Sequence, residues 1–433
     1  MKKTKRPVAV DLFAGCGGMS LGLEAAGFDV AVSVEYDAVH SIVHHFNFPY
    51  GRTMCRDVST VTGGEILNEL EKGGYSKDVD LIAGGPPCQG FSHMGKRQLD
   101  DPRNSLVFEY LRIIREIKPK YFLFENVPGI ATGEHKRFLD ELIEEFEAIG
   151  YQIEKPVRIL DASLYGAPQK RKRLIIMGSR SDVVQATYPK PTHLGKVATG
   201  NDLFVDETNP LNSVGDAIAN LQEIEVYKET DMGVPAKGVK YTGFAESLAL
   251  KPAGVYASCH ERTGIDKVWG HLGSVHTQVS IDRFNKTKPG DVEIKSRFLR
   301  LSADGLCNTL RAGTNSDKGA YTAPRPIHYS LPRCISVREA ARLHSYPDWF
   351  QFHRTIWHGF REIGNSVIPI FGKELGASVV KALGLNQSAF ERRTLEPMNL
   401  EMLSFTMSQA CVYWGIKDDA IAKRKRILSA KEI

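Results

Sequence analysis

The residues VAVDLFAGCGGMSLGLEAA (Val8–Ala26) have the pattern of a strand, a glycine-rich turn and a helix. Val8–Phe13 is a short apolar run typical of a buried strand, and Met19–Ala26 has the length and apolar spacing of a helix. The glycines of the turn between them let a backbone approach a ligand closely, and a helix amino terminus favours negative groups. Alone, this unit leaves a nucleotide-like ligand and an ordinary turn equally open.

Similar units follow as far as about residue 178. We expect further strands at Val30–Glu35, Asp80–Ala83, Tyr121–Glu125 and Leu174–Gly178, and helices at Ala38–Phe46, Ser105–Ile117 and His135–Ile149. Helical pattern returns at Ser336–His344 and Ser366–Leu383. This alternation predicts βαβ units and an α/β fold with a doubly wound, mostly parallel sheet.

The pattern changes near Ser179, where Gly, Pro, Thr, Asn and Asp begin to recur at short intervals. Such composition predicts irregular β structure and loops. We therefore expect a catalytic domain at residues 1–183, an inserted region at residues 184–330, a return to the first domain at 331–385 and a helical C-terminal extension at 386–433.

Charge is distributed unevenly along the inserted region, although the net charge of the chain is only +5. Residues 184–261 carry 6 Lys and Arg against 10 Asp and Glu, whereas residues 262–330 carry 11 against 6. The basic half predicts a surface that faces phosphates. An ordinary solvated surface is the alternative.

Composition excludes several classes of protein. Hydrophobic residues make up 42% and charged residues 25%, which is typical of a soluble globular protein, and no apolar run is long enough to span a bilayer. The basic start has no apolar signal region, so we expect a cytoplasmic protein. The seven cysteines lack CxxC spacing, and Cys259, His260, His271 and His276 match no zinc module. We therefore expect neither a disulfide framework nor a metal.

A second informative segment is GGPPCQGFS (Gly84–Ser92), which follows the expected strand Asp80–Ala83. Proline fixes φ and glycine permits tight turns, so the Cys88 thiol is presented on a rigid loop at the carboxyl end of a strand, where open α/β sheets hold their chemistry. A buried structural cysteine is the alternative, but Pro-Pro and Gln-Gly make a poor core segment. The loop indicates a nucleophile.

Two acidic residues sharpen the interpretation of the glycine-rich turn. Glu35 ends the second expected strand, where a dinucleotide fold places the carboxylate that accepts ribose hydroxyls, and Asp57 could accept from an adenine amino group. A nicotinamide enzyme is the competing interpretation. Against it, Ser20 stands where the third glycine of GxGxxG would fall, and the Cys88 loop has no role in hydride transfer.

Several short motifs together resemble the DNA (cytosine-5)-methyltransferase family of the bacterial restriction-modification kind. They occur in that family's order: FAGCGG (Phe13–Gly18), Glu35, Asp57, GGPPCQGFS, FENV (Phe124–Val127), QKRKR (Gln169–Arg173), REAARL (Arg338–Leu343) and GNSV (Gly364–Val367). They span residues 8–178 and 333–383, about half of the chain. The family commonly has Glu between the two arginines, where this chain has Lys172, which puts a local ion pair in doubt.

The resemblance implies S-adenosylmethionine as methyl donor and residues of about 184–330 as the target-recognition domain. The residues that it implies for the cofactor are Phe13, Gly15, Gly17, Gly18, Glu35, Tyr36, Asp57, Val58, Pro87, Leu106, Asn365 and Val367. Phe13 would pack on the adenine, the glycines would admit the methionine end, and Asn365 and Val367 would close the site.

The resemblance also implies an activity, methylation of cytosine at C5. Cytosine C5 is a weak nucleophile, so the Cys88 thiolate would first add at C6. Glu125 would hold N3 and the amino group, and Arg173 with Arg171 would bind the base carbonyl and a flanking phosphate. The base must be flipped out of the duplex, and we expect residues 92–104 to form a loop that closes on it.

Double-stranded DNA is the partner that this implies. The residues expected to contact it are Gln89, Ser92, Arg97, Arg297, Arg300, Thr309, Arg311, Asn315 and Lys318. We expect a monomer, with a cognate restriction endonuclease that would act separately. A tRNA-directed member of the family is one rival, although its Cys-Phe-Thr signature is absent from this sequence, and a catalytically dead regulator is another, although both Cys88 and Glu125 are present.

Overall fold

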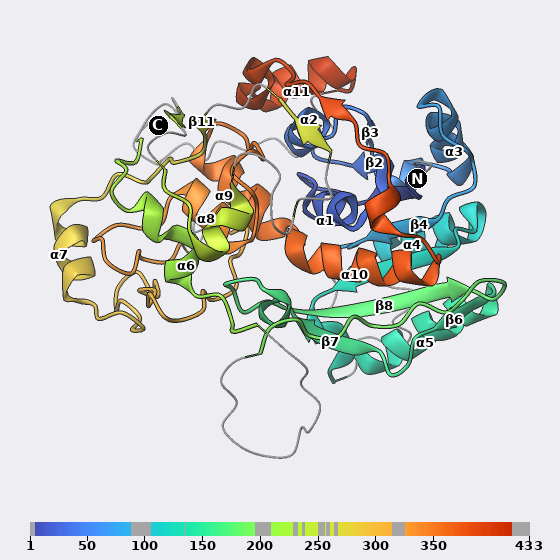
Figure 1. Ribbon diagram of the computed structural model, residues 1–433, viewed down its shortest axis with the longest axis horizontal. Helices are drawn as coiled ribbons and strands as arrows, with labels where there is room; N and C mark the ends of the chain where they lie inside the picture. Colours follow the sequence, from blue (N-terminus) through green and yellow to red (C-terminus); the bar gives the residue numbers. More distant parts are fainter. Residues whose placement is uncertain are drawn as a thin grey trace, which may run out of the picture.

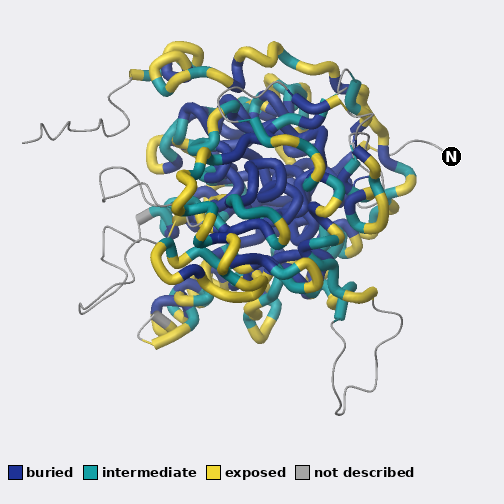
Figure 2. Tube along the Cα trace, turned by 90° about the vertical axis from the view of Figure 1, so that its left-hand side faces the viewer, coloured by how far each residue is buried: buried dark blue, intermediate teal, exposed yellow. Residues whose placement is uncertain are grey.

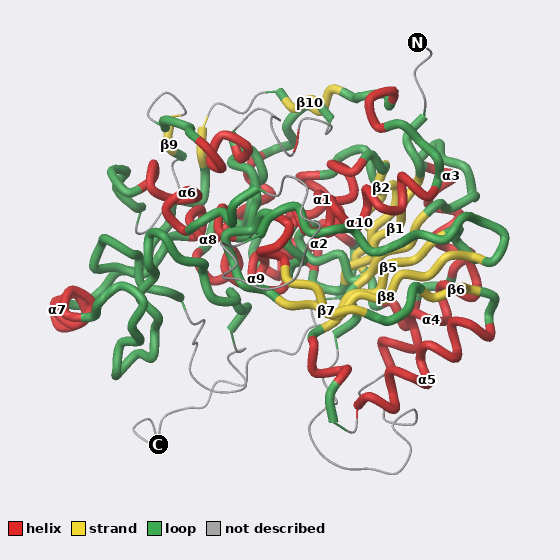
Figure 3. The backbone as a smooth tube through the Cα atoms, turned by 60° about the horizontal axis from the view of Figure 1, so that its bottom comes forward, coloured by secondary structure: helices red, strands yellow, loops and turns green. Residues whose placement is uncertain are grey.

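The computed structural model describes residues 5–87, 105–133, 135–194, 209–227, 233–235, 239–249, 256, 260–263, 267–313 and 325–417. Figure 1 shows the sheet and its covering helices on one side of the molecule, with α6 and α7 on the other. Figure 3 shows that the strands gather in the first part and that loops dominate the second. Buried backbone lies at the centre, and exposed segments lie around it (Figure 2).

The main sheet has eight strands in the order β3-β2-β1-β4-β5-β8-β6, with β7 also paired to β8. The strands are β1 (Val8–Leu12), β2 (Asp29–Glu35), β3 (Arg52–Cys55), β4 (Leu81–Gly84), β5 (Tyr121–Asn126), β6 (Tyr151–Ile153), β7 (Arg158–Asp161) and β8 (Lys172–Arg180). The first five are parallel, and β8 is antiparallel to β5, β6 and β7. This confirms the predicted α/β fold with a mainly parallel sheet.

Helices cover both faces of this sheet. They are α1 (Gly18–Ala26), α2 (Ala38–Asn47), α3 (Gly63–Lys72), α4 (Ser105–Ile117), α5 (His135–Ala148) and α10 (Pro369–Ala382). Successive strand residues point to opposite faces. Val8, Val10 and Leu12 accordingly pack with α3, α4 and α5, whereas Ala9 packs with α1 and α10.

Helices α1 and α10 approach each other through small residues. A Cβ on Gly22 would lie 2.5 Å from the Pro369 carbonyl oxygen, and one on Gly376 would lie 2.8 Å from the Ala26 Cβ. Real Cβ atoms essentially never approach another atom this closely, so packing of the two helices at this distance requires glycine at both positions. The returning segment is thereby packed directly beside the glycine-rich turn that precedes α1.

The inserted region contains short elements where it is described. They are α6 (Val214–Ile218), β9 (Val234–Pro235), β10 (Glu261–Arg262), β11 (Lys267–Val268) and α7 (Gln278–Lys286). Residues of this region share one hydrophobic cluster with α8 (Val337–Leu343) and α9 (Ile356–Asn365) of the returning segment. The boundaries expected from composition stay predictions, because this shared core joins the two segments.

The C-terminal extension is less helical than expected over its described residues. Beyond α10 it has the two-residue strand β12 (Thr394–Leu395), which pairs with β10, and the helix α11 (Met407–Trp414). Helix α11 packs on α2, and the Trp414 indole N–H donates to the Ala38 carbonyl at 3.1 Å. The extension therefore covers α2, as Figure 1 shows.

Candidate active site

The sheet brings the expected site residues to one edge. Because β1 to β5 are parallel, their carboxyl ends share that edge, where Phe13 follows β1, Glu35 ends β2 and Glu125 lies near the end of β5. The start of β8, with Arg173, lies at the same edge because β8 runs antiparallel to β5. The strand order departs in opposite directions from β1 and β4, and open α/β sheets bind ligands at such a switch point.

The turn after β1 has the backbone of a close-approach loop. The φ angles of Phe13, Gly15 and Gly17 are 60°, 56° and 102°. A Cβ on Gly17 would lie 2.4 Å from Phe48 Cε2, so packing requires glycine there. A Cβ on Gly15 would meet nothing within 4 Å, so Gly15 borders open space that a ligand group can enter.

Glu35 is fixed beside this turn by the backbone. The Gly15 N–H donates to Oε2 at 2.8 Å, and the Asp37 N–H donates to Oε1 at 2.8 Å. Burial raises the pKa of Glu35. Each carboxylate oxygen accepts more than one hydrogen bond, so both can still accept ribose hydroxyls.

Asp57 follows β3 and is held by its own turn, since the Ser59 N–H and hydroxyl donate to Oδ1 at 2.9 and 2.8 Å. The side chain of Val58 is buried in the core between the sheet and α3 to α5, which leaves its main chain as the part that could face a ligand. Of the other expected cofactor residues, Tyr36 and Pro87 are exposed and Leu106 is half-buried.

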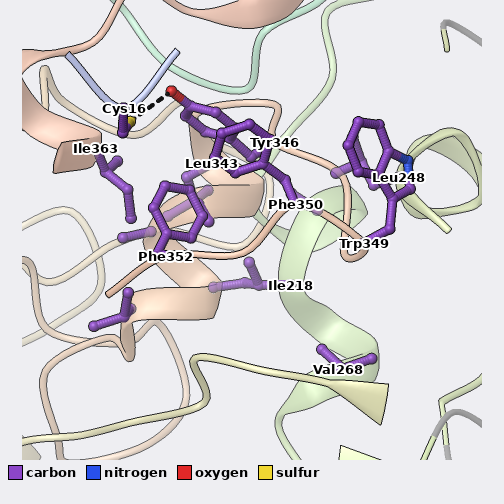
Figure 4. Packing of buried hydrophobic residues seen from close by; sticks show 14 of the residues in the cluster. Cys16, Ile218, Leu248, Val268, Leu343, Tyr346, Trp349, Phe350, Phe352 and Ile363 are labelled. Carbon is purple, nitrogen blue, oxygen red and sulfur yellow. Dashed lines mark hydrogen bonds between the residues drawn. The ribbon is translucent and has the colours of Figure 1, made fainter. Parts of the chain in front are cut away.

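The returning segment closes on the glycine-rich turn. A Cβ on Gly18 would lie 2.3 Å from the Val367 carbonyl oxygen, and Asn365 is exposed at the end of α9. The Cys16 thiol and the Tyr346 hydroxyl are hydrogen-bonded at 3.3 Å, a contact drawn in Figure 4. Two expected cofactor segments that are some 350 residues apart in the sequence are therefore in contact.

The expected catalytic residues Glu125 and Arg173 form a pair at this edge. Arg173 Nε lies 2.6 Å from Glu125 Oε1, and the two side chains are 13% and 12% exposed. A Cβ on Gly85 would lie 2.7 Å from Glu125 Oε2, so the loop after β4 touches this carboxylate. The Asn126 side-chain amide also donates to the Pro86 carbonyl at 3.1 Å. The loop that leads to Cys88 is thus anchored at both Glu125 and Asn126.

Several expected residues lie outside the described residues. They are Cys88, Gln89, Ser92, Arg97, Asn315 and Lys318, together with the whole of the expected loop at residues 92–104. The roles given to them stay predictions.

Arg171 differs from the expected base or phosphate contact. It is 3% exposed, and its terminal nitrogens donate to the carbonyls of Leu310, Gly364 and Ser366 at 2.8, 3.0 and 3.0 Å. Burial, with the nearby charge of Arg173, lowers the pKa of Arg171 to about 9. Its side chain joins the inserted region to the returning segment.

The Gln169 side chain strengthens the same junction, which sequence reasoning did not assign. Its oxygen accepts from the Leu310 N–H at 3.0 Å, and its amide donates to the Leu343 carbonyl at 3.2 Å. A Cβ on Gly364 would lie 2.2 Å from the Ala312 nitrogen, so the backbone at 311–312 rests on this glycine. Arg311 is exposed next to these fixed residues.

The other expected DNA contacts fall into two groups. Arg297 is exposed and has a φ of 60°, and Thr309 donates its hydroxyl to the Lys170 carbonyl at 2.7 Å. Arg300 is buried, and its guanidinium donates to the carbonyls of Phe284 and Thr287 at 2.7 and 2.9 Å. Arg300 therefore stabilises the inserted region from inside rather than reaching a base.

A buried series of hydrogen-bonded polar side chains lies beside the glycine-rich turn, and the sequence analysis did not predict it. The Ser20 hydroxyl donates to Asp11 Oδ2 at 2.5 Å and lies 2.9 Å from His44 Nε2. Burial raises the pKa of Asp11 to about 7 and lowers that of His44 to about 3. An aspartate inside the apolar run of the first strand was the available signal.

The histidines considered for zinc have separate partners. His260 Nε2 lies 3.2 Å from Asp29 Oδ1, and its Nδ1 accepts a hydrogen bond from the Arg393 N–H. His271 is hydrogen-bonded to the Ser336 hydroxyl. His276 accepts from the Cys334 N–H, and Cys259 lies outside the described residues.

Comparison with known proteins identifies the family. The C-5 cytosine-specific DNA methylase family model matches residues 8–381. The type II methyltransferase M.XorII of Xanthomonas oryzae pv. oryzae is 44% identical over 97% of this chain and 95% of its own length, and M.DdeI of Desulfomicrobium norvegicum is 31% identical over 86% and 88%. A prophage-encoded E. coli protein assigned as a DNA modification methyltransferase has a TM-score of 0.69 and 32% identity, over 88% of this chain and 100% of that chain. S. pombe Dnmt2, 17% identical with a TM-score of 0.53, shares the fold.

The chain belongs to the C-5 cytosine-specific DNA methylase family and is a DNA cytosine-5 methyltransferase. This confirms the family and the fold class that the motifs indicated. Over the described residues, no helix is both long and apolar enough to cross a membrane.

Proposed function

We propose that this protein methylates C5 of a flipped-out cytosine within a specific sequence of duplex DNA, with S-adenosylmethionine as methyl donor and Cys88 as nucleophile. The observation that carries the proposal is the Glu125–Arg173 pair, which contacts the loop leading to Cys88 at the carboxyl edge of the sheet. The glycine-rich turn and Glu35 lie at the same edge. The loop of the nucleophile, the carboxylate that would bind the base and the residues that would bind the cofactor therefore form one proposed site.

The glycine-rich turn (Phe13–Gly18) and Glu35, together called the cofactor cradle, suit the methyl donor. Gly15 borders open space, Glu35 keeps free acceptor capacity for two ribose hydroxyls, and Phe13 offers a half-buried ring for the adenine. Asn365 and Val367 would close the pocket from the returning segment. S-adenosylmethionine supplies an electrophilic methyl group on a sulfonium, which cytosine C5 can accept only after the ring has been activated.

Cys88 and Glu125 would activate the ring together. The Cys88 thiolate forms a bond from its sulfur to C6, and the C5–C6 π electrons shift so that C5 becomes nucleophilic. Glu125 hydrogen-bonds N3 and the amino group and favours the proton at N3 while the ring carries extra electron density. After C5 has gained the methyl group, its proton leaves to a base, the C5–C6 double bond re-forms and the thiolate departs.

Arg173 and Arg171 would divide the remaining work. Arg173 pairs with Glu125 and would also donate to the cytosine carbonyl. Arg171 acts as a positioning residue, because its donors are already used on three backbone carbonyls. We therefore replace the phosphate contact first expected of Arg171 with a role in fixing residues 310–312.

Sequence reading would come from the inserted region. Arg311 is exposed beside the junction that Gln169, Arg171 and Gly364 fix, and Arg297 is exposed in the basic half. Arginine donates hydrogen bonds to guanine edges and also binds phosphates. Arg311 and Arg297 would therefore contact either a base edge or a phosphate of the DNA.

A role in a restriction-modification system follows from the relatives, of which several are named type II methyltransferases. The protein would act in the cytoplasm on host DNA, protecting it from an endonuclease that cuts the same sequence. Methylation-sensitive sequencing of DNA from a host that expresses the chain should reveal one modified sequence. Uniform or absent cytosine methylation would contradict the proposed specificity.

The covalent step can be tested with a duplex whose target cytosine carries fluorine at C5, because the final elimination then cannot occur. A complex that survives denaturation is expected, and it should require both the methyl donor and Cys88. The Cys88→Ser variant should form none, whereas Cys334→Ala, which removes another thiol, should still form it. A complex with Cys88→Ser, or methylation of tRNA but not of duplex DNA, would overturn the proposal.

A further inference from the structure

A cluster of three metal-ligating side chains lies where α2 packs near α9. His40 comes from α2, and His358 and Glu362 are one turn apart on α9. One ligand atom from each residue lies within 4.8 Å of the other two. The cluster belongs to neither the expected catalytic residues nor the expected DNA contacts.

Polar atoms in this cluster lack partners. His40 Nε2, His358 Nδ1 and Glu362 Oε1 are buried and have no hydrogen-bond partner within the described part of the chain. His40 is 4% exposed and Glu362 is 1% exposed. Buried polar groups are nearly always satisfied, and leaving one unsatisfied costs about 1–3 kcal/mol. These atoms belong to three side chains whose candidate ligand atoms lie within 4.8 Å of one another, so a single ion among them would give each side chain a partner.

The surroundings hold the ligands and suit a cation. The second carboxylate oxygen of Glu362 accepts a hydrogen bond from the backbone N–H of His353 at 3.1 Å, which fixes the carboxylate. The ring centroids of His353 and His358 lie 4.5 Å apart. Asp37 adds a second carboxylate, whose charge acts on His40 and His358. Arg361 brings a positive charge that partly offsets the negative charge of Asp37.

We propose that His40, His358 and Glu362 bind one divalent transition-metal ion, with zinc as the best match. Two imidazole nitrogens and one carboxylate oxygen are a ligand set that zinc accepts, usually with a water in the fourth position, whereas calcium and magnesium prefer oxygen ligands. Zinc ligands lie about 2.0–2.2 Å from the ion, so the three atoms must close inward by rotation of their side chains.

Such an ion would connect the cofactor cradle to the returning segment. On the α2 side, His40 follows Asp37, whose N–H donates to Glu35. On the α9 side, the Glu362 carbonyl accepts from the Cys16 thiol at 3.6 Å, and α9 ends at Asn365. The metal would thus connect the helix that begins just after Glu35 to the helix that ends at Asn365.

The test uses the full chain, purified without a histidine tag, loaded with zinc and dialysed. Wild-type protein should retain one zinc per chain, measured by elemental analysis. Glu362→Gln and His358→Gln should raise the zinc dissociation constant at least about a hundredfold, since even outer groups around metal sites change affinity about 10–100-fold. His45→Gln, on the same helix α2 but outside the cluster, is the matched control and should bind like wild type.

Two further measurements keep the result interpretable. Glutamine has the shape of glutamate and keeps an oxygen for the His353 N–H, so Glu362→Gln should fold normally without metal and lose only the zinc-dependent rise in melting temperature. Cobalt substituted for zinc should give a visible spectrum without the strong thiolate charge-transfer band, because no cysteine is a ligand. Zinc binding that is unchanged in Glu362→Gln and His358→Gln, a thiolate band, or no retained zinc in the wild type would overturn the proposal.

Discussion

The sheet domain and the inserted region reach the expected site by different physical routes. Glu35 and Glu125 are placed by parallel strands, whose ladder fixes where each strand ends. Arg311 is placed by side chains from distant segments, namely Gln169 and Arg171, and by the close contact at Gly364. The comparison teaches that the proposed chemical half of the site depends on the regular pairing of strands in one sheet, whereas the proposed DNA-facing half depends on a few individual side-chain contacts.

The largest effect is expected from Glu125→Gln in the sheet domain. The loss of the carboxylate that pairs with Arg173 should lower kcat by on the order of 10³, while cofactor affinity stays unchanged. Methyl transfer to duplex DNA and direct cofactor titration measure the two quantities. Glu141→Gln, which removes a carboxylate paired with Arg137 on α5, is the control. Equal losses in both variants would show that Glu125 has no special role.

A smaller effect is expected at the contact that joins the two regions, the buried pair of Glu24 on α1 with Arg262. The two guanidinium nitrogens donate to the carboxylate oxygens at 2.9 and 3.0 Å. Burial opposes ionisation of Glu24, but the charges of Arg262 and His260 outweigh it and lower the pKa to about 2. Glu24→Gln should lower the free energy of unfolding by about 3 kcal/mol at pH 7.

The sign of the pH dependence follows from that lowered pKa. The unfolded carboxyl takes up its proton near pH 4.5 and the folded one only near pH 2, so the stabilisation is complete above about pH 5 and is lost as the pH falls towards 2. Denaturation of wild type and Glu24→Gln at pH 7 and pH 4 should therefore show a shrinking difference. Glu69→Gln, which breaks more exposed pairs with Arg52 and Lys72, should cost under about 1 kcal/mol, and an equal cost at Glu24 would refute the bridging role.

The smallest effect is expected from Gly364→Ala. The new Cβ would meet the backbone of Arg311 and Ala312 at 2.3 and 2.2 Å, so this segment must shift, at a cost of about 1–3 kcal/mol. Discrimination between the target and altered sequences should fall while the cofactor still binds. Gly129→Ala, where a Cβ meets nothing within 4 Å, should behave as wild type. Intact discrimination in Gly364→Ala would show that residues 311–312 do not read DNA.

Sequence reasoning located most of the sheet and the residues at its edge. Strands β1, β2, β4, β5 and β8 and helices α1, α2, α4 and α5 lie within a few residues of their expected ranges. It missed β3, which has four mixed residues, and α9, whose helical pattern was overlooked. It also missed α3, although Thr62 and Glu65 form a capping box that was readable in the sequence.

The site was predicted unevenly for a related reason. Glu125 and Arg173 were identified by motif, and the structure brings them together. Arg171 and Arg300 look like surface cations in the sequence, but both are buried on backbone carbonyls. Burial of an arginine depends on which carbonyls the fold leaves unpaired nearby, and no local pattern carries that information.

The sequence by itself determined the chemistry of this protein, because strand periodicity, glycine-rich turns and the ordered motifs are local properties of the chain. Only the tertiary structure decided which arginines are exposed and which are buried, how Gly364 supports residues 311–312 and that His40 lies close to His358 and Glu362. Those contacts join segments up to some 320 residues apart, and such pairings are set by packing of the whole core rather than by neighbours along the chain.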